Sequence, residues 1–241
     1  MKVLILGYGK MGRAIEKIAL DRGHTVPYKI DQYNAADLLQ LGGNDVDVAI
    51  EFSQPDSAFE NIKTCLQNGI PVVSGTTGWL EKKNEIDALC AEKDGAFFYA
   101  SNYSIGVNIF FKLNKYLAKI MDHYAAYDVG MEEIHHIHKK DEPSGTAITL
   151  AEGIASEMKR KDHWALGPGG TETQISITSK REGEVPGTHV INYASEIDDI
   201  EIKHTAHSRT GFALGAVLVA EWLKDKKGSL GMDDFLDIPN T

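Results

Sequence analysis

The opening strand and turn constrain the fold of this chain more than any other feature. An apolar run at residues 3–6, typical of a buried strand, leads directly into Gly7-Tyr8-Gly9-Lys10-Met11-Gly12 and then a helical pattern. In such a G-x-G-x-x-G turn the first glycine permits the tight turn, the second lets the backbone approach a pyrophosphate, and the third lets the helix pack closely on the strand. The pattern predicts a dinucleotide site at the helix N-terminus. A glycine-rich turn without a ligand is the alternative.

The order of apolar patterns predicts two kinds of sheet. Strand-like runs at 3–6, 25–30, 46–51, 70–74 and 96–99 alternate with helical patterns at 11–20, 55–67 and 80–92, which predicts a parallel sheet covered on both faces. A long helical stretch at 107–124, a strand at 127–137 and a helix at 144–159 follow. Three strand-like runs at 173–180, 188–194 and 196–204 then succeed one another without a helix, which indicates an antiparallel or mixed sheet.

These patterns define the expected fold class and domains. The fold class is α/β, with an N-terminal Rossmann-type parallel-sheet domain and an α+β domain with a mixed sheet. We expect residues 1–106 and 212–241 to form the dinucleotide-binding domain, because the last apolar helix, at 212–223, folds back on the first domain. Residues 107–211 would form the substrate-binding and oligomerisation domain.

Composition excludes several classes of function. The formal net charge is −10 and no basic stripe offsets it, so we expect no nucleic-acid partner. No apolar run reaches about 18 residues, so we expect no membrane partner. The two cysteines, Cys65 and Cys90, fall on apolar faces of expected helices, which favours buried thiols and a cytoplasmic location. An acidic protein that binds an anionic substrate must concentrate positive charge locally.

Asp31 bears on the choice of cofactor. It stands 19 residues after Gly12, at the end of the second expected strand, where a carboxylate accepts hydrogen bonds from the ribose hydroxyls. Its charge would repel a 2′-phosphate, and the neighbouring Gln32 is neutral, so NADH is favoured over NADPH. Lys10 and Lys29 are the residues that could reach such a phosphate. The alternative for Asp31 is a carboxylate that caps its own loop.

The densest chemistry lies between Glu133 and Ala147. The sequence there is E-I-H-H-I-H-K-K-D-E-P-S-G-T-A. His135 and His136 alternate on a strand, so they face opposite sides unless the strand ends between them. Ser144 then opens a helix, whose N-terminus attracts anions. Histidines, lysines and a helix start together predict a cationic pocket for a dicarboxylate.

Three alternatives stand beside this pocket. Clustered histidines can bind zinc, but the spacing is not H-E-x-x-H and no paired cysteines accompany it, so we expect no metal site. The segment can also be a solvated loop with an ordinary helix cap. A lysine that forms a Schiff base would need a depressed pKa.

The same segment resembles the signature of the 4-hydroxy-tetrahydrodipicolinate (dihydrodipicolinate) reductase family, E-x-H-H-x-x-K-x-D-x-P-S-G-T-A. The resemblance also covers the glycine turn, Gly75-Thr76-Thr77-Gly78, residues 102–107 and residues 204–212, and so nearly the whole chain. It implies reduction by NADH or NADPH of a cyclic dicarboxylic imine to tetrahydrodipicolinate, with loss of water, on the diaminopimelate route to lysine. It also implies a homotetramer.

The resemblance assigns roles to residues of this chain. His135 would be the general acid, with Lys139 sometimes given an acid role, and the substrate carboxylates would be held by His136, Lys139, Ser144, Gly145 and Thr146. The cofactor would contact the glycine turn, Asp31, Gly75, Thr76, Thr77, Ser101, Asn102, Tyr103, Arg209 and Phe212. The chain departs from the family pattern in the short segment 32–45, in Lys10 where arginine is common, and at Ser101 and Tyr103.

Other functions share parts of this pattern. An amino-acid dehydrogenase fits the cofactor half equally well and fails only on the long central motif. An acylating semialdehyde dehydrogenase needs a catalytic cysteine, which buried thiols do not provide. A sensor that binds NADH without consuming it would not need His135, Lys139 and the Ser144 helix start together, so turnover discriminates it from an enzyme.

Overall fold

The structure is a computed structural model, and it describes residues 1–168, 171–208 and 210–237. The chain divides into two compact units. The first comprises residues 1–105 and the segment that begins at Thr210, and the second comprises the intervening residues from Gly106 onward. The chain therefore leaves and re-enters the first unit within one or two residues of the expected boundaries, because the returning helix begins at Thr210 and not at Phe212.

The first unit is built on a parallel six-stranded sheet. The strands are β1 (Lys2–Leu6), β2 (Thr25–Ile30), β3 (Val48–Glu51), β4 (Val72–Ser74), β5 (Ala96–Tyr99) and β11 (Gly228–Leu230). Their order is β11-β5-β4-β3-β1-β2, and every pairing is parallel. All four residues of β3 are buried, as a strand covered on both faces requires.

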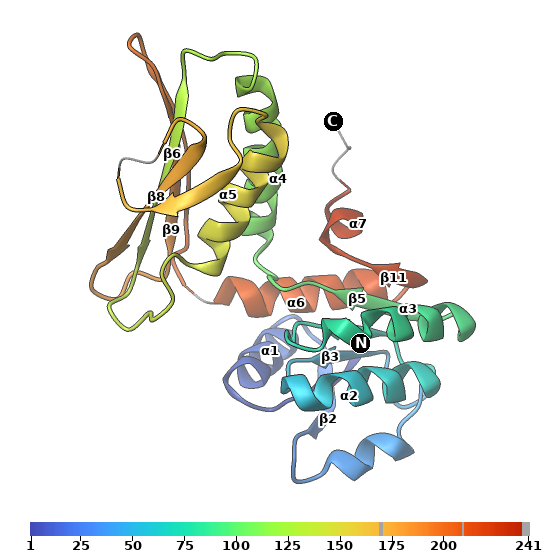
Figure 1. Cartoon of the computed structure of the whole chain (residues 1–241). Coiled ribbons are helices and arrows are strands. Elements are labelled where there is room, and N and C mark those ends of the chain that lie inside the picture. The colour runs from blue at the N-terminus through green and yellow to red at the C-terminus, as the bar shows by residue number, and fades with distance from the viewer. Residues whose placement is uncertain (169–170, 209, 238–241) are drawn as a thin grey trace. The chain divides into compact units, whose positions relative to one another are not determined.

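Helices cover both faces of this sheet (Figure 1). The helices are α1 (Lys10–Asp21), α2 (Pro55–Gln67), α3 (Lys83–Glu92), α6 (Thr210–Leu223) and α7 (Met232–Leu236), with short 3₁₀ segments η1 (Ala35–Gln40) and η2 (Leu80–Lys82). One core cluster contains buried residues of α1 and α6, and the other contains buried residues of α2 and α3. The expected return of the last apolar helix to the first domain is thus observed.

The second unit holds a mixed five-stranded sheet. Its strands are β6 (Asp128–His135), β7 (His163–Leu166), β8 (Gln174–Arg181), β9 (Thr188–Ala194) and β10 (Asp199–Thr205), in the order β10-β9-β6-β8-β7. The central strand β6 pairs parallel with β8 and antiparallel with β9. Helices α4 (Ile105–Met121) and α5 (Gly145–Glu157) contribute to the core on one face of this sheet. The expected fold class is therefore confirmed for both units.

Short elements were the ones that the sequence patterns did not predict. The strands β7 and β11, the helix α7 and the segment η1 span only three to six residues each, too few for a periodic signal. The strand expected at 127–137 ends at His135, and the helix expected at 80–92 begins as a 3₁₀ turn. Within the part of the chain that the structure describes, no helix is both long and apolar enough to span a bilayer.

Candidate active site

The glycine turn has the geometry that close backbone approach requires. Gly7 has φ +91°, and a Cβ there would lie 2.1 Å from the Phe52 carbonyl oxygen. A Cβ on Gly12 would lie 2.2 Å from the Gly7 carbonyl oxygen, whereas one on Gly9 would project into open space. Gly9 is also the N-cap of α1 and makes no side-chain cap hydrogen bond. The first N–H groups of α1 are therefore open to an anionic ligand, as a pyrophosphate site requires.

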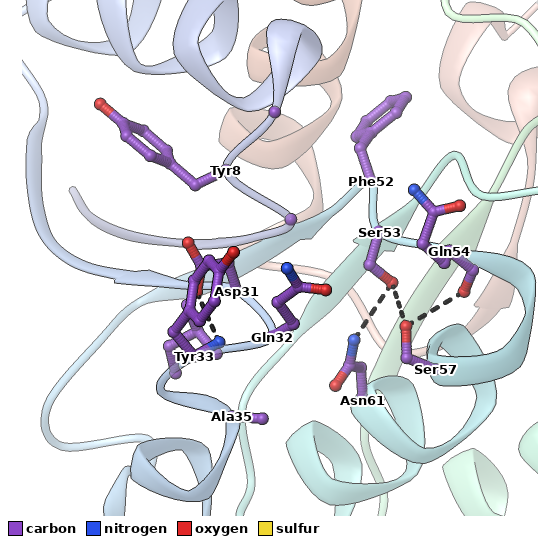
Figure 2. Close-up of a pocket in the computed structure, with 13 residues that line it drawn as sticks. Tyr8, Asp31, Gln32, Tyr33, Ala35, Phe52, Ser53, Gln54, Ser57 and Asn61 are labelled. Carbon is purple, nitrogen blue, oxygen red and sulfur yellow. Dashed lines mark hydrogen bonds between the residues drawn. The ribbon is translucent and has the colours of Figure 1, made fainter.

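A cavity of about 370 Å³ lies beside this turn, at the carboxyl ends of β1, β2 and β3. Figure 2 shows its lining, with Tyr8 on one side, Asp31 and Gln32 after β2, and Phe52 and Ser53 after β3. Ligands of parallel α/β sheets bind at this edge of the sheet. Four residues predicted from sequence thus line one cavity: Gly7, Tyr8, Gly9 and Asp31. The cavity lies where a dinucleotide binds in this type of sheet.

Asp31 caps its own loop and also lines the cavity. Its Oδ1 accepts a hydrogen bond of 2.8 Å from the Tyr33 backbone N–H, so the carboxylate does cap its own loop (Figure 2). The same side chain lines the cavity. Lys29 is engaged elsewhere, because its Nζ lies 2.8 Å from Oε1 of Glu16. The carboxylate of Glu16 therefore offsets the charge that Lys29 would bring to a phosphate.

Sequence reasoning missed Glu51, a fully buried carboxylate at the end of β3. Its Oε1 accepts hydrogen bonds from the Ser53 backbone N–H at 2.9 Å and from Thr76 Oγ1 at 2.8 Å, and its Oε2 accepts one from Ser74 Oγ at 2.6 Å. The Ser53 hydroxyl also donates to Oε1. Glu51 therefore ties the cavity residue Ser53 to the Gly75–Gly78 turn. The only sequence signal for this role of Glu51 was an acidic residue at the end of an otherwise apolar strand.

The remaining predicted cofactor residues occupy different environments. Thr76 and Tyr103 are buried, and the Tyr103 hydroxyl donates to the Ser74 carbonyl oxygen at 2.6 Å, so these two side chains support the turn from inside the unit. Thr77 and Ser101 are exposed, and Gly75 and Asn102 are partly exposed. Lys10 and Met11 begin α1, and Phe212 lies in the first turn of α6 without lining the cavity. Arg209 lies outside the described residues.

In the second unit, β6 ends between the two adjacent histidines. His135 is its last residue and is 7% exposed, whereas His136 follows in the loop and is partly exposed. The strand thus ends between the two histidines, so the alternation of a strand does not force their side chains to opposite faces. A Cβ on Gly187 would lie 2.9 Å from His135 Nε2, so the ring lies directly against this glycine.

A buried carboxylate, Glu133, orients His135. The His135 Nδ1 pairs with Glu133 Oε2, and Arg181 Nη1 donates to Glu133 Oε1 at 2.9 Å. Burial alone would raise the pKa of Glu133, but the hydrogen bonds from His135 and Arg181 outweigh it and lower the pKa to about 2. The carboxylate is therefore charged at neutral pH. It pairs with Nδ1 and leaves Nε2 of His135 outside this pair.

Two further groups lie against this pair. The His135 and His189 rings pack edge to face, with centroids 5.2 Å apart. His189 Nε2 lies 3.2 Å from Oγ of Ser144, which is the N-cap of α5 and accepts a hydrogen bond from the Ala147 N–H. Burial lowers the pKa of His189 to about 4, so its ring is neutral at pH 7.

The other predicted substrate residues surround the start of α5. Gly145 and Thr146 are its first two residues, with Gly145 exposed and Thr146 partly exposed. Lys139 lies in the loop after β6, where its Nζ forms an ion pair of 2.8 Å with Asp141. The second unit thus collects Ser144, Gly145, Thr146 and His135 from one sequence segment. Glu133 belongs to the same segment, and the sheet register adds Arg181 and His189 from neighbouring strands.

Glu133, His135 and His189 also form the kind of group that holds metal ions, since their ligand atoms all lie within 4.8 Å of one another. Both carboxylate oxygens of Glu133 are already paired, one with His135 and one with Arg181. A metal would have to displace the proton between Glu133 and His135. The arrangement therefore fits an oriented acid better than a metal centre.

The two cysteines are buried free thiols, as expected. Burial raises the pKa of the Cys65 thiol above its ordinary value, and the pKa of Cys90 is raised as well, first by burial. Raised pKa values oppose formation of a nucleophilic thiolate. An acylating dehydrogenase that uses a cysteine is thereby disfavoured.

Comparison with known proteins matches both units to the same family. A family model described as the N-terminus of dihydrodipicolinate reductase matches residues 1–103, and one described as its C-terminus matches residues 106–236. The chain is 50% identical over 236 residues to the 4-hydroxy-tetrahydrodipicolinate reductase of Christiangramia forsetii, with 98% of each chain covered.

Solved structures show the same architecture. The chain is similar to a dipicolinate-bound dihydrodipicolinate reductase from Paenisporosarcina sp. TG-14, with a TM-score of 0.77 and 22% identity over 98% of this chain and 99% of that one. An amine dehydrogenase from Mycobacterium smegmatis aligns with a TM-score of 0.53 and 12% identity over 95% and 94% of the two chains. At these identities the likeness concerns the fold alone, which dehydrogenases of different substrates share.

Proposed function

The chain belongs to the dihydrodipicolinate reductase family, and from this premise we propose that it reduces 4-hydroxy-tetrahydrodipicolinate to tetrahydrodipicolinate with loss of water, on the diaminopimelate route to lysine. The family places the protein among NAD(P)H-dependent oxidoreductases. The single observation that carries the proposal is the Glu133–His135 pair beside the Ser144 helix start. The Glu133–His135 pair would supply a proton, and the helix start would bind a carboxylate. The reduction of a dicarboxylate imine needs both.

His135 acts as the general acid in this proposal. The Glu133 carboxylate holds Nδ1 and stabilises a positive charge on the ring, so that Nε2 can deliver its proton to the substrate. The bound nicotinamide would supply the hydride, to ring C4. A positioned acid contributes about 10²- to 10⁴-fold to the rate. Lys139 is the second candidate for the acid role.

The substrate carboxylates are held at the start of α5. The Ser144 hydroxyl and the N–H groups of Gly145 and Thr146 would donate to one carboxylate, where the helix dipole favours negative charge. His136 and Lys139 would add donors from the loop after β6. Lys139 is paired with Asp141 in this structure, so its ammonium group would have to leave that carboxylate to bind the substrate.

NADH is the proposed preferred cofactor, with NADPH as the alternative. Gly9 would lie against the pyrophosphate and Asp31 would accept hydrogen bonds from the adenosine ribose. Asp31 would repel a 2′-phosphate, and Glu16 offsets the charge of Lys29. Lys10 and Arg13, which lies over the Tyr8 ring, are the other cations of this region. The resemblance also supports a homotetramer in the cytoplasm, and a light-scattering mass of one 26.5 kDa chain would contradict the tetramer.

The test is oxidation of NADH and NADPH by the purified protein, with substrate made in situ by condensing pyruvate with aspartate semialdehyde. Wild type should consume cofactor, and His135→Gln should lose about 10²-fold or more in kcat. His123→Gln, at an exposed histidine of the same unit, is the matched control and should keep full activity. Binding of NADH without turnover would overturn the reductase and favour a sensor or another dehydrogenase.

A further inference from the structure

His189 is a buried histidine in the second unit to which neither the sequence motifs nor the proposed mechanism gives a role. It is 4% exposed and lies on β9, directly opposite Glu133 on β6 and His204 on β10. Its ring contacts that of His135, and its Nε2 reaches the Ser144 hydroxyl. One side chain thus contacts both the proposed acid and the proposed anion site.

The hydrogen bonds of Ser144 depend on which nitrogen of His189 carries the proton. A hydroxyl has one hydrogen and two acceptor positions. Ser144 Oγ already accepts from the Ala147 N–H. If His189 Nε2 is protonated, it donates to the second acceptor position, and the Ser144 hydrogen is free to point at a ligand. If Nε2 is bare, the Ser144 hydrogen is used on His189, and oxygen lone pairs face the ligand instead.

The surroundings of His189 select between these tautomers. Its Nδ1 is buried and has no hydrogen-bond partner among the residues that the structure describes. A buried N–H without an acceptor is rarer in proteins than a buried acceptor without a donor. The proton therefore belongs on Nε2, and the bare nitrogen is Nδ1.

We propose that His189 is a positioning residue, which donates from Nε2 to Ser144 and so turns the Ser144 hydroxyl hydrogen toward a carboxylate of the substrate. Its ring also packs against the side of the His135 ring, and so holds His135 and Ser144 in a fixed arrangement. This inference rests on the proposed function, since it assumes that Ser144 binds a carboxylate. It predicts that a side chain with a donor at the Nε2 position can replace His189, and that one without such a donor cannot.

Two amide variants form a matched pair for the test. His189→Gln places an N–H group near the position of Nε2, whereas the shorter His189→Asn places it near Nδ1, out of reach of Ser144. Calorimetry with dipicolinate, in the presence of NADH, measures binding without turnover. We expect His189→Asn to weaken dipicolinate binding about tenfold, the loss of one hydrogen bond to a charged group, and His189→Gln to stay within about threefold of wild type.

A double-mutant cycle tests whether the effect passes through Ser144. Ser144→Ala should weaken dipicolinate binding about as much as His189→Asn, and the two changes together should weaken it no further. ¹⁵N chemical shifts of the ring provide a readout that does not depend on the fold of any variant. They should show the proton on Nε2 in wild type.

The outcomes separate the inference from the proposed function. Equal losses in His189→Gln and His189→Asn, additive losses in the cycle, or a proton on Nδ1 would each overturn the role of His189 and leave the reductase intact. Wild-type protein that neither binds dipicolinate nor oxidises cofactor would overturn both. The urea denaturation curve serves as the check that the second unit of each variant is folded.

Discussion

The two units each bury one glutamate completely, and they satisfy it in opposite ways. Glu51, at the end of β3, is surrounded by neutral donors from Ser53, Ser74 and Thr76. Glu133, near the end of β6, is paired with Arg181 and His135. The first carboxylate fixes the backbone turns that line the cavity. The second pairs with a histidine ring, so a similar buried carboxyl group serves shape in one unit and, in the proposed mechanism, proton chemistry in the other.

The comparison is tested most severely by removing Glu133. Glu133→Ala leaves Arg181 and His135 without their buried partner, so the free energy of unfolding should fall by about 3–5 kcal/mol. Urea denaturation measures it. The matched control is Glu132→Ala on the same strand, which breaks a half-exposed pair with Lys180 and should cost under about 1 kcal/mol. Equal losses for the two variants would show that the buried pair carries no special stability.

Acid should destabilise the second unit in two steps. The pKa of His189 is near 6.5 in the unfolded chain and about 4 in the folded one, so the unfolded state takes up the proton first as pH falls. Stability is then complete above about pH 6.5 and falls by about 3 kcal/mol toward pH 4. The pKa of Glu133 is lowered to about 2, so its contribution is present above about pH 4.5 and is lost as pH falls toward 2.

Denaturation at pH 7 and at pH 4.5 measures the first step. His189→Gln removes the titrating ring and should remove most of the difference in unfolding free energy between the two pH values. If His189→Gln loses as much unfolding free energy between pH 7 and pH 4.5 as wild type does, the loss comes from other histidines.

Glu51 should be the more tolerant of the two glutamates. In Glu51→Gln an amide NH₂ faces donors where a carboxylate oxygen accepted, so about 1–3 kcal/mol of unfolding free energy should be lost. The KM for NADH should rise with it, because Ser53 and the Gly75–Gly78 turn lose their common anchor. Glu60→Gln, at an exposed site on α2, should change neither quantity. A loss as large as that of Glu133→Ala would erase the distinction between the two carboxylates.

The smallest expected effect concerns the cofactor cavity. Asp31→Asn removes one negative charge near the proposed 2′-position, so the ratio of kcat/KM for NADPH to that for NADH should rise about tenfold, or about 1.4 kcal/mol. Asp37→Asn, at an exposed acid in η1, is the control and should leave the ratio unchanged. An unchanged ratio in Asp31→Asn would mean that Asp31 serves only its own loop.

The two sites differ in how far sequence predicts them. The glycine turn is contiguous, and its role depends on backbone conformation, so Gly7, Gly9 and Asp31 could be placed in one cavity before the structure was known. The second site depends on register. Glu133 lies opposite Ser179 and His189, and His135 lies opposite Arg181, across strands up to 56 residues apart in sequence. No local pattern contains those pairings, so Arg181 and His189 were missed.

The return of α6 to the first unit has a consequence for synthesis on the ribosome. Ala213, Ala216, Val217 and Leu223 of α6 belong to the same core cluster as Val3 and Ile5 of β1. When the first 105 residues have emerged, one face of their sheet therefore still lacks part of its cover. The second unit, by contrast, is one continuous stretch of chain and can complete its own core earlier. We expect the segment made first to be the last to become fully folded, and to be the region that most needs protection while the chain is still growing.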